Sequence, residues 1–568
     1  MIPAQVWAPF PETVELELRD GGRPLQPGQR GWRRSGELAP GIEYRFRLDG
    51  RDPALPDPRS PSQPEGVHGW SRTVDQGGFR WSDGAWPGFD LGAAVIYELH
   101  VGTFTPEGTF AGVAGRLDHL VELGVNVVEL MPVAEFAGDR GWGYDGVDLY
   151  APHHAYGGPD ELKRLVDACH GRGLGVLLDV VYNHLGPEGN YLERFGPYFT
   201  DRYTTPWGKA INFDGPGSDE VRGFFIDNAL MWLRDYHFDG LRLDAVHAIV
   251  DSSAVHFLEE LELRVEQLAA ELGRPLHLVA ESAANDPRLV WGRERGGYGL
   301  AATWSDDFHH ALHAVLTGER TGYYGDYGSL HDLSDALRQA YVYTGRYSSF
   351  RQKHYGRPPA GLGGERFLAY IQNHDQVGNR AQGERLGHLV SVGRLKIAAA
   401  LVLTSPFVPL LFMGEEWAAS TPFPFFASHT DPGIAEGATK GRRREFAAFG
   451  WKPQDVPDPM DPATFESAKL RWEELAGDPH REVCEWYRAL LRLRREQPSL
   501  CAGNLGSVRV DVSEEEGRLV VRRGGIAVAC NLGRAALDPG LDGQLLLASE
   551  AAAGGRSLPP EAVVVARA

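Results

Sequence analysis

The chain has 568 residues, more than a single ordinary domain holds, so roughly two to four domains are expected. Hydrophobic residues make up 42% and charged residues 24%, which supports a large core and argues against disorder. The net charge of −20 argues against nucleic acid and anionic membranes as partners, because both are bound by clustered basic side chains. A neutral polar substrate fits this charge.

The cysteines and the N-terminus indicate the compartment. Cys169, Cys484, Cys501 and Cys530 form no CxxC pair and have no histidine cluster near them, which predicts reduced thiols. The first residues have no basic start and no continuous apolar run, so no signal peptide is expected. No apolar stretch reaches the roughly 18 residues of a membrane span. The sequence therefore predicts a cytoplasmic protein.

Residues 1–90 have the pattern of an all-β domain. VELEL (14–18) and YRFRL (44–48) alternate apolar and polar side chains, as half-buried strands do. Glycine- and proline-rich turns separate them, and the proline-rich stretch 52–66 is expected to be a surface excursion. We predict an N-terminal β-sandwich of the immunoglobulin-like type found in carbohydrate-binding modules.

Residues 91–500 alternate short apolar runs with helical segments, which predicts a (β/α)8 TIM barrel. Continuous apolar runs are typical of buried parallel strands. A doubly wound sheet is the alternative architecture. The eight runs are AVIYELHVGTF (94–104), VNVVELMPV (125–133), LGVLLDVVYNH (174–184), GLRLDAVH (240–247), LHLVAES (276–282), AATWSDDF (301–308), RFLAYIQNHD (366–375) and FVPLLFMGEE (407–416).

Helices are expected between these runs. The heptad-like apolar spacing predicts helices over 113–123, 159–173 and 218–237, the last with Ser218 as N-cap, and a final barrel helix within 481–497. The long insertion 417–480 is expected to be functional or lid-like. Five short strands between 508 and 567 predict a C-terminal all-β domain over 501–568.

Polar side chains gather where the predicted barrel strands end, which is the catalytic face of a TIM barrel. One carboxylate at a strand end is usually a cap or an ion-pair partner, but a converging set is better explained by function than by stability. The set is Asp179, Asn183 and His184 after the third run, Arg242, Asp244 and His247 in the fourth, Glu281 in the fifth, Asn373, His374 and Asp375 in the seventh, and Glu415 and Glu416 in the eighth.

Glycoside hydrolysis uses such a cluster, because it needs one carboxylate as nucleophile or base and one carboxylic acid. Asp244 and Glu281 end neighbouring strands and suit the spacing of about 5–5.5 Å that predicts retention. Arg242 lies two residues before Asp244, on the same side of the strand, and can orient it. Glu281 has to start protonated, and Asp375 is expected to bind sugar hydroxyls. Aromatic residues suited to stacking on pyranose rings are Tyr97, Trp142, Tyr144, Trp207 and Trp304.

Four of these stretches, DVVYNH (179–184), GLRLDAVH (240–247), VAES (279–282) and IQNHD (371–375), resemble the motifs of the α-amylase family, glycoside hydrolase family 13. The resemblance implies a retaining double displacement on α-glucans. It implies Asp244 as nucleophile, Glu281 as acid/base and Asp375 as transition-state stabiliser. It also implies that His184 and His374 contact the sugar in subsite −1 and that Tyr144 is its stacking platform.

Longer stretches, among them 97–110, 143–170, 207–222, 303–327, 372–386 and 412–446, resemble the members of this family that hydrolyse the α-1,4 bond next to a terminal trehalose unit. The resemblance implies maltooligosyltrehalose and malto-oligosaccharides as ligands and a functional partnership with maltooligosyltrehalose synthase. Trp207, Trp304 and His309 are the candidate contacts on the trehalose side.

Two departures from the family concern the site. An acidic residue is expected soon after the general acid, but Glu281-Ser282 is followed by Ala283-Ala284. Many α-amylases bind calcium through an asparagine equivalent to Asn183, but the surrounding residues do not supply the six to eight oxygen ligands that calcium takes. We expect no essential metal and no cofactor.

Three alternatives remain. A glycogen-branching or debranching enzyme of the same family would share the carboxylates, and the loops TWSDDFHH and FMGEEW would distinguish it. A glucan-binding scaffold without activity is disfavoured by the intact carboxylate set. A metal-dependent hydrolase needs paired histidines, but His153-His154 and His309-His310 are adjacent, and neighbours on a strand point to opposite faces.

Overall fold

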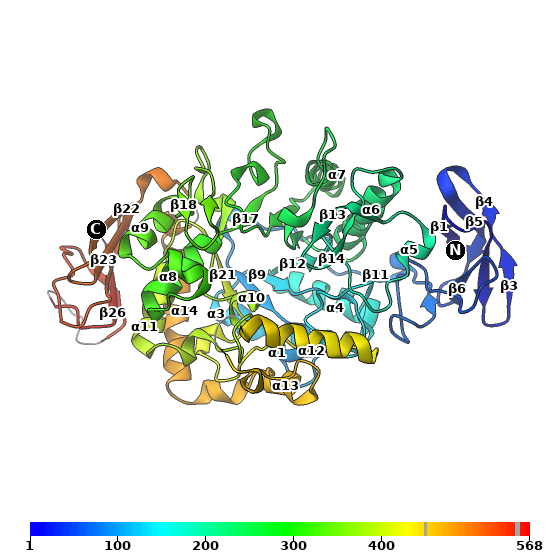
Figure 1. The fold of residues 1–568 in the computed structure, drawn as a ribbon. Coiled ribbons are helices and arrows are strands. Elements are labelled where there is room, and N and C mark those ends of the chain that lie inside the picture. Colours follow the sequence, from blue (N-terminus) through cyan, green and yellow to red (C-terminus); the bar gives the residue numbers. More distant parts are fainter. Residues whose placement is uncertain (448–450, 502, 551–556, 568) are drawn as a thin grey trace.

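The structure is a computed structural model that describes residues 1–447, 451–501, 503–550 and 557–567. The molecule is elongated, with the N-terminal strands at one end, the C-terminal sheet at the other and the barrel between them (Figure 1). No helix in the described ranges is both long enough and apolar enough to cross a membrane.

The eight predicted apolar runs form one closed parallel barrel, which confirms the TIM barrel and excludes the doubly wound sheet. Its interior is filled by side chains such as Ile96, Val127, Leu177 and Leu410, all without exposed surface. The strands are β8 (Ile96–Leu99), β9 (Val127–Leu130), β12 (Gly175–Val180), β15 (Gly240–Leu243), β16 (His277–Ala280), β17 (Ala302–Trp304), β20 (Phe367–Ala369) and β21 (Val408–Phe412).

Helices surround the barrel, and two of the predicted ones differ in detail. The helix expected over 113–123 is two short helices, α2 (Phe110–Ala114) and α3 (Leu117–Leu123), because the backbone leaves helical geometry at Arg116. Ser218 is the first residue of α6 (Ser218–Asp235) rather than its cap, and Gly217 takes the cap position at φ 81°. The other main helices are α4 (Gly158–His170), α7 (Phe257–Leu272), α8 (Asp306–Thr317), α9 (Leu330–Gln339), α11 (Val392–Leu403) and α14 (His480–Glu496).

β-sheets lie at the two ends of the chain. The N-terminal strands form a four-stranded sheet in the order β3 (Gly21–Pro24), β2 (Val14–Leu18), β6 (Glu43–Leu48), β7 (Ser71–Arg72), and a three-stranded sheet of β1 (Ile2–Trp7), β5 (Trp32–Leu38) and β4 (Gln26–Pro27). The C-terminal sheet has the order β22 (Arg509–Ser513), β23 (Arg518–Arg523), β24 (Ile526–Asn531), β26 (Ala562–Arg567), β25 (Leu545–Ala548). The predicted strands in both regions are present; the domain boundaries at 90 and 500 remain our proposal.

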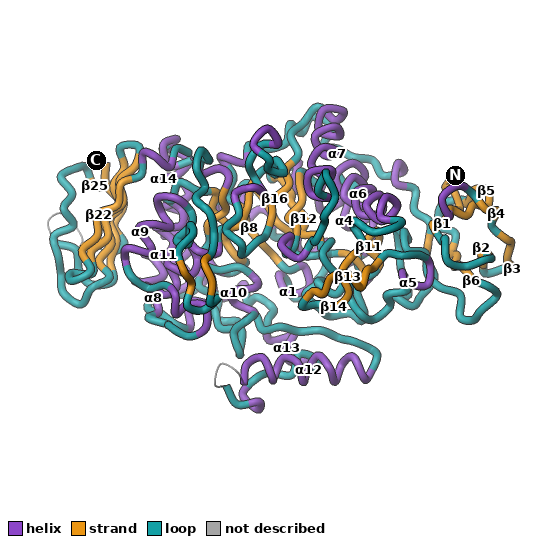
Figure 2. The backbone as a smooth tube through the Cα atoms, turned by 45° about the horizontal axis from the view of Figure 1, so that its top comes forward, coloured by secondary structure: helices purple, strands orange, loops and turns teal. Residues whose placement is uncertain are grey.

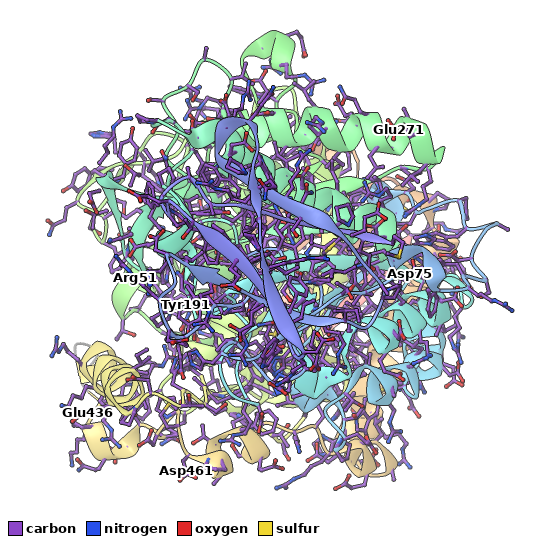
Figure 3. The ribbon with its side chains drawn as sticks, turned by 90° about the vertical axis from the view of Figure 1, so that its right-hand side faces the viewer. Arg51, Asp75, Tyr191, Glu271, Glu436 and Asp461 are labelled. Atoms are coloured by element: carbon purple, nitrogen blue, oxygen red, sulfur yellow. The ribbon has the colours of Figure 1, made fainter. Side chains whose placement is uncertain are left out.

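The insertion 417–480, apart from 448–450, which lie outside the described residues, contains α12 (Pro432–Ala447) and α13 (Pro462–Ser467). Both helices lie along one side of the barrel (Figure 2). Seen from the N-terminal end, Glu436 of α12 and Asp461 next to α13 lie at one edge of the molecule, and Glu271 of α7 lies at the opposite edge (Figure 3). A lid role for the insertion stays a prediction.

Candidate active site

The predicted catalytic carboxylates meet in one cleft at the carboxyl ends of the barrel strands. Asp244 follows β15, Glu281 follows β16 and Asp375 lies beyond β20, and all three line a cavity of 630 Å³. Tyr144, His184, Trp207 and His374 also line it, so these four sequence-predicted substrate residues are brought together.

Arg242 is the centre of the charge network. Its side chain has no exposed surface, and its Nη1 donates to Asp244 Oδ1 at 3.0 Å and to Asp179 Oδ2 at 2.6 Å. Its Nη2 lies 3.1 Å from Glu281 Oε2. The parallel register pairs Arg242 directly with Asp179 on β12, which explains why these side chains meet. One buried guanidinium therefore holds three carboxyl groups from three neighbouring strands.

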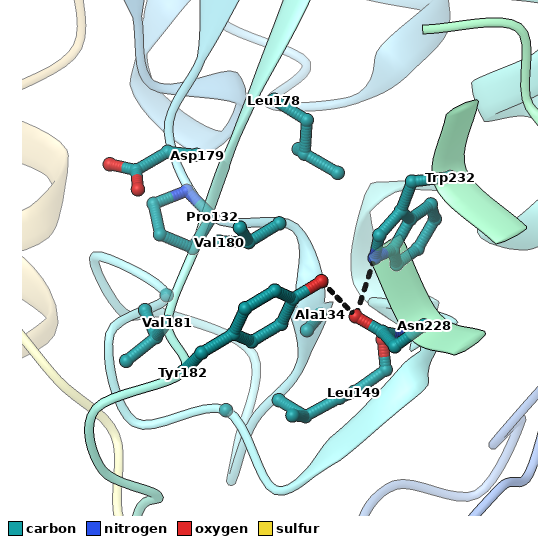
Figure 4. Close-up of a pocket in the computed structure, with 12 residues that line it drawn as sticks. Pro132, Ala134, Leu149, Leu178, Asp179, Val180, Val181, Tyr182, Asn228 and Trp232 are labelled. Atoms are coloured by element: carbon teal, nitrogen blue, oxygen red, sulfur yellow. Dashed lines mark hydrogen bonds between the residues drawn. The ribbon is translucent and has the colours of Figure 1, made fainter. Parts of the chain in front are cut away.

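Asp179 supports the site from below. Its side chain points to the opposite side of β12 from Leu178 (Figure 4). On the Leu178 side, the Tyr182 hydroxyl and the Trp232 indole N–H both donate to Oδ1 of Asn228. Burial raises the pKa of Asp179 to about 7, although the charge of Arg242 opposes this rise. The Tyr144 hydroxyl donates to Asp179, so Asp179 orients both Arg242 and the expected stacking platform.

Asn183 orients the expected nucleophile. Its Nδ2 donates to Asp244 Oδ2 at 2.7 Å and to the Asp244 carbonyl at 2.8 Å. Its Oδ1, the oxygen through which it would reach a calcium ion, contacts Nδ1 of His184. With Oδ1 of Asp244 held by Arg242, both carboxylate oxygens have a donor and the side chain has one orientation.

Glu281 and Asp375 complete the carboxyl set. Glu281 Oε2 accepts from the backbone N–H of Ala245 at 2.6 Å, and Ala245 has the left-handed φ of 38° that turns this N–H inward. Asp375 lies in the first turn of α10 (His374–Gly378), with 38% of its side chain exposed. Partial burial and the nearby charge of Glu281 raise the pKa of Asp375, and the charge of His374 opposes the rise.

Asp375 also lines a second cavity of 370 Å³, so the two cavities meet at Asp375 and Asn379. The second cavity is bounded by residues after β16, β17 and β20, among them Ala283, Asp306, Tyr323 and Phe350. Ala283, where an acidic residue was expected, is thus part of a cavity wall. The second cavity therefore continues the cleft beyond Asp375.

Glu98 is a site residue that the sequence analysis missed. It lies in β8, is 1% exposed, and accepts from Nδ1 of His374 at 2.6 Å and from the His374 backbone N–H at 2.8 Å. The available signal was an acidic residue inside the apolar run IYELHV, where a buried charge needs a partner. Other missed residues line the wider cleft from loops or, for Arg442, from α12: Asp145, Phe425, His429 and Arg442.

The stability of the fold is expected to fall as His374 loses its proton. Burial lowers the pKa of His374, but the charges of Glu98 and then Asp375 outweigh burial and raise it to about 9. The protonated His374 therefore contributes about 3 kcal/mol to the free energy of unfolding. This contribution is fully present below the unfolded pKa of about 6.5 and is lost as the pH rises through 9. Urea unfolding at pH 6.5 and pH 10 measures this loss, and a His374→Gln variant that shows the same loss would contradict it.

The aromatic residues of the cleft are held in place by contacts with neighbouring rings. Tyr144 stacks on His374 with ring centroids 4.9 Å apart, and Trp142 packs edge-on against the same imidazole at 5.6 Å. Trp207, at the turn between β13 (Phe199–Thr205) and β14 (Gly208–Ile211), stacks on His184 at 5.2 Å and is 46% exposed. Trp207 is therefore the cleft aromatic with an open ring surface.

Three predicted contacts are wrong in this structure because the side chains are buried. Trp304 is 1% exposed and lies under the Arg242 guanidinium at 4.2 Å, so it supports the cation and cannot stack on a sugar. His309 is 1% exposed, with its ring nitrogens bonded to the Ile371 carbonyl and the Tyr324 hydroxyl. Tyr97 is fully buried and donates to Glu416. The FMGEEW loop is likewise buried and packs in the protein core.

Comparisons with known proteins agree with the geometry. The family described as alpha amylase, catalytic domain, matches residues 68–204, and a domain of unknown function, DUF3459, matches residues 503–565. A malto-oligosyltrehalose trehalohydrolase from Mycobacterium tuberculosis (strain CDC 1551 / Oshkosh) is 50% identical over 96% of this chain and 95% of its own length. One from Arthrobacter ramosus is 51% identical over 93% of this chain and 92% of its own length.

The chain belongs to the malto-oligosyltrehalose trehalohydrolases. The likeness extends over nearly the whole chain, which confirms the resemblance seen in the motifs. A crystal structure from Salmonella typhimurium, provisionally named an α-amylase, covers 100% of this chain and 97% of its own with a TM-score of 0.93 at 40% identity. The barrel and the flanking sheets described here are therefore shared with that solved structure over nearly the whole of both chains.

Proposed function

We propose that the protein hydrolyses the α-1,4-glucosidic bond next to the terminal trehalose of maltooligosyltrehalose and releases trehalose and a malto-oligosaccharide. The observation that carries the chemistry is the contact of one buried guanidinium with both Asp244 and Glu281. The substrate follows from membership of the trehalohydrolases, two of which are about half identical to this chain over more than 90% of their length.

In the first step Asp244 attacks the anomeric carbon of the sugar in subsite −1 while Glu281 gives its proton to the glycosidic oxygen. The carbon–oxygen bond to trehalose breaks, and the malto-oligosaccharide becomes covalently bound to Asp244. Arg242 and Asn183 hold Oδ1 and Oδ2 of the nucleophile, so the attack starts from one fixed orientation.

In the second step Glu281 takes a proton from water as the water oxygen attacks the anomeric carbon. The bond between this carbon and Asp244 breaks, and Asp244 leaves as a carboxylate. Asp375 and His374 face the same cleft and are placed to bind hydroxyls of the −1 ring while positive charge develops at its anomeric carbon. Two displacements at one carbon leave the new reducing end in the α configuration.

Two further inferences concern the partner enzyme and the cellular compartment. The substrate ends in an α,α-1,1 linkage, so a reaction that rearranges the reducing end of a malto-oligosaccharide has to supply it; maltooligosyltrehalose synthase is the partner we propose. All four cysteines are free thiols, three of them buried, which supports work in the cytoplasm.

Proton NMR during hydrolysis tests the retaining mechanism. We expect the malto-oligosaccharide to be released with its reducing end as the α anomer, which then mutarotates to the equilibrium mixture. Initial appearance of the β anomer would show inversion and would remove Asp244 from the role of nucleophile.

Replacing Trp207 by alanine is expected to raise KM for maltotriosyltrehalose about 3- to 10-fold, because an exposed stacking surface is lost. The change in kcat should be small, since Trp207 contacts none of the three carboxyl groups. Inhibition by free trehalose should weaken in parallel if Trp207 lies on the trehalose side. Phe10→Ala is the control, because Phe10 is 59% exposed in the loop between β1 and β2. Equal KM values in wild type and Trp207→Ala would refute the contact.

A further inference from the structure

A cluster of metal-ligating side chains lies outside the catalytic cleft, at the base of the loop that carries Trp142 and Tyr144. Glu135 ends β10 (Ala134–Glu135), and His153 and His154 follow β11 (Asp148–Pro152), with which β10 pairs antiparallel. The three residues offer one carboxylate oxygen and two imidazole nitrogens within 4.8 Å of one another.

The sequence argument against such a pair of adjacent histidines was wrong at this position. Neighbours point to opposite faces only while the strand continues, and here β11 ends at Pro152 and a 3-10 helix begins at His154. The turn brings both imidazoles to the same carboxylate. Nδ1 of His154 lies 2.7 Å and Nδ1 of His153 lies 3.3 Å from Oε1 of Glu135.

These separations suit a shared cation. Two ligands bound to zinc at about 2.0–2.1 Å in tetrahedral geometry lie about 3.3 Å apart. Glu135 and His153 have no exposed surface, and neither ring nitrogen of His153 makes a hydrogen bond. A buried imidazole without a hydrogen-bond partner is costly, and coordination would give its Nδ1 a partner. His154, with 27% of its side chain exposed, leaves a path for the ion and for water.

We propose that Glu135, His153 and His154 bind one divalent transition-metal ion of the zinc class, with water as a fourth ligand. Two imidazoles and one carboxylate form a set that zinc takes in proteins, and they do not suit calcium or magnesium, which prefer all-oxygen sites. The ion links the end of β10 to the segment after β11 through its three protein ligands. Because the loop between these strands carries Trp142 and Tyr144, the ion fixes the base of one wall of the cleft.

Cobalt and zinc titrations of the full-length, chelator-treated protein test the site. We expect one equivalent of Co²⁺ to give the intense visible bands of a four-coordinate ion, and one equivalent of Zn²⁺ to displace it. Zn²⁺ should also raise the apparent Tm of the wild type. Glu135→Gln and His154→Gln should weaken Zn²⁺ binding by at least about 100-fold and abolish the rise in Tm.

His331→Gln is the matched control, because His331 is an exposed histidine on α9, and it should bind like the wild type. His154 is partly exposed, so His154→Gln keeps the test open even if the buried Glu135→Gln protein does not fold. Absence of stoichiometric binding in the wild type would overturn the proposal. So would binding that persists unchanged in a folded His154→Gln protein, because the ion would then be held elsewhere.

Discussion

Asp244→Asn is expected to lower kcat by about four orders of magnitude or more, because an amide cannot form the covalent intermediate. Glu281→Gln should lose activity to a similar extent, since the leaving trehalose oxygen then lacks its proton donor. Circular dichroism and kcat on maltotriosyltrehalose measure fold and turnover separately.

Asp145→Asn is the control for these two variants. Asp145 lines the same cleft, but its carboxylate lies near His429, with Nε2 to Oδ2 at 3.7 Å, rather than on Arg242. A change of less than about 10-fold is expected there. Turnover close to wild type in Asp244→Asn or Glu281→Gln would contradict the assignment of the two catalytic residues.

Arg242→Leu is expected to lower the free energy of unfolding by about 3–5 kcal/mol, because it leaves Asp179, Asp244 and Glu281 without their buried cation. Arg242→Lys should recover part of the stability but little of the kcat, since one ammonium cannot reproduce the contacts of Nη1 and Nη2. Urea unfolding and steady-state kinetics distinguish the two effects.

Arg222→Leu is the matched control for Arg242. Arg222 is 8% exposed and bonds Asp251 and Glu260 at 2.6 Å each, on a helix outside the cleft. It should lose stability in a similar way while the folded protein keeps its kcat. Full kcat in Arg242→Lys would contradict the account in which one guanidinium positions both catalytic carboxyl groups.

The barrel could be predicted from the sequence because its strands are continuous apolar runs of the right length, and all eight form strands. The carboxylates could be predicted because they stand at fixed places after those runs. Helix breaks were less visible: nothing in the apolar spacing of 113–123 indicated the turn at Arg116. Local capping was also misjudged at Ser218, where Gly217 takes the cap position.

The depth of a side chain could not be predicted from its position beside a strand. Trp304 and Trp207 both follow the pattern of loop aromatics, yet Trp304 points into the barrel under Arg242 and Trp207 lies on an exposed hairpin. The alternation of side chains along β17 sets the direction of Trp304, and the tight β13–β14 hairpin sets the exposure of Trp207. The residues from the 417–480 insertion that reach the cleft, such as Phe425 and Arg442, depend on tertiary packing and left no periodic signal.

Product analysis on maltotriosyltrehalose and maltopentaose under matched conditions tests the proposed function most directly. Rapid release of free trehalose from maltotriosyltrehalose, with slow attack on maltopentaose, is the predicted result. Equal attack on both substrates, or the formation of new branch points, would contradict the trehalohydrolase activity while leaving the barrel and its carboxylate set in place.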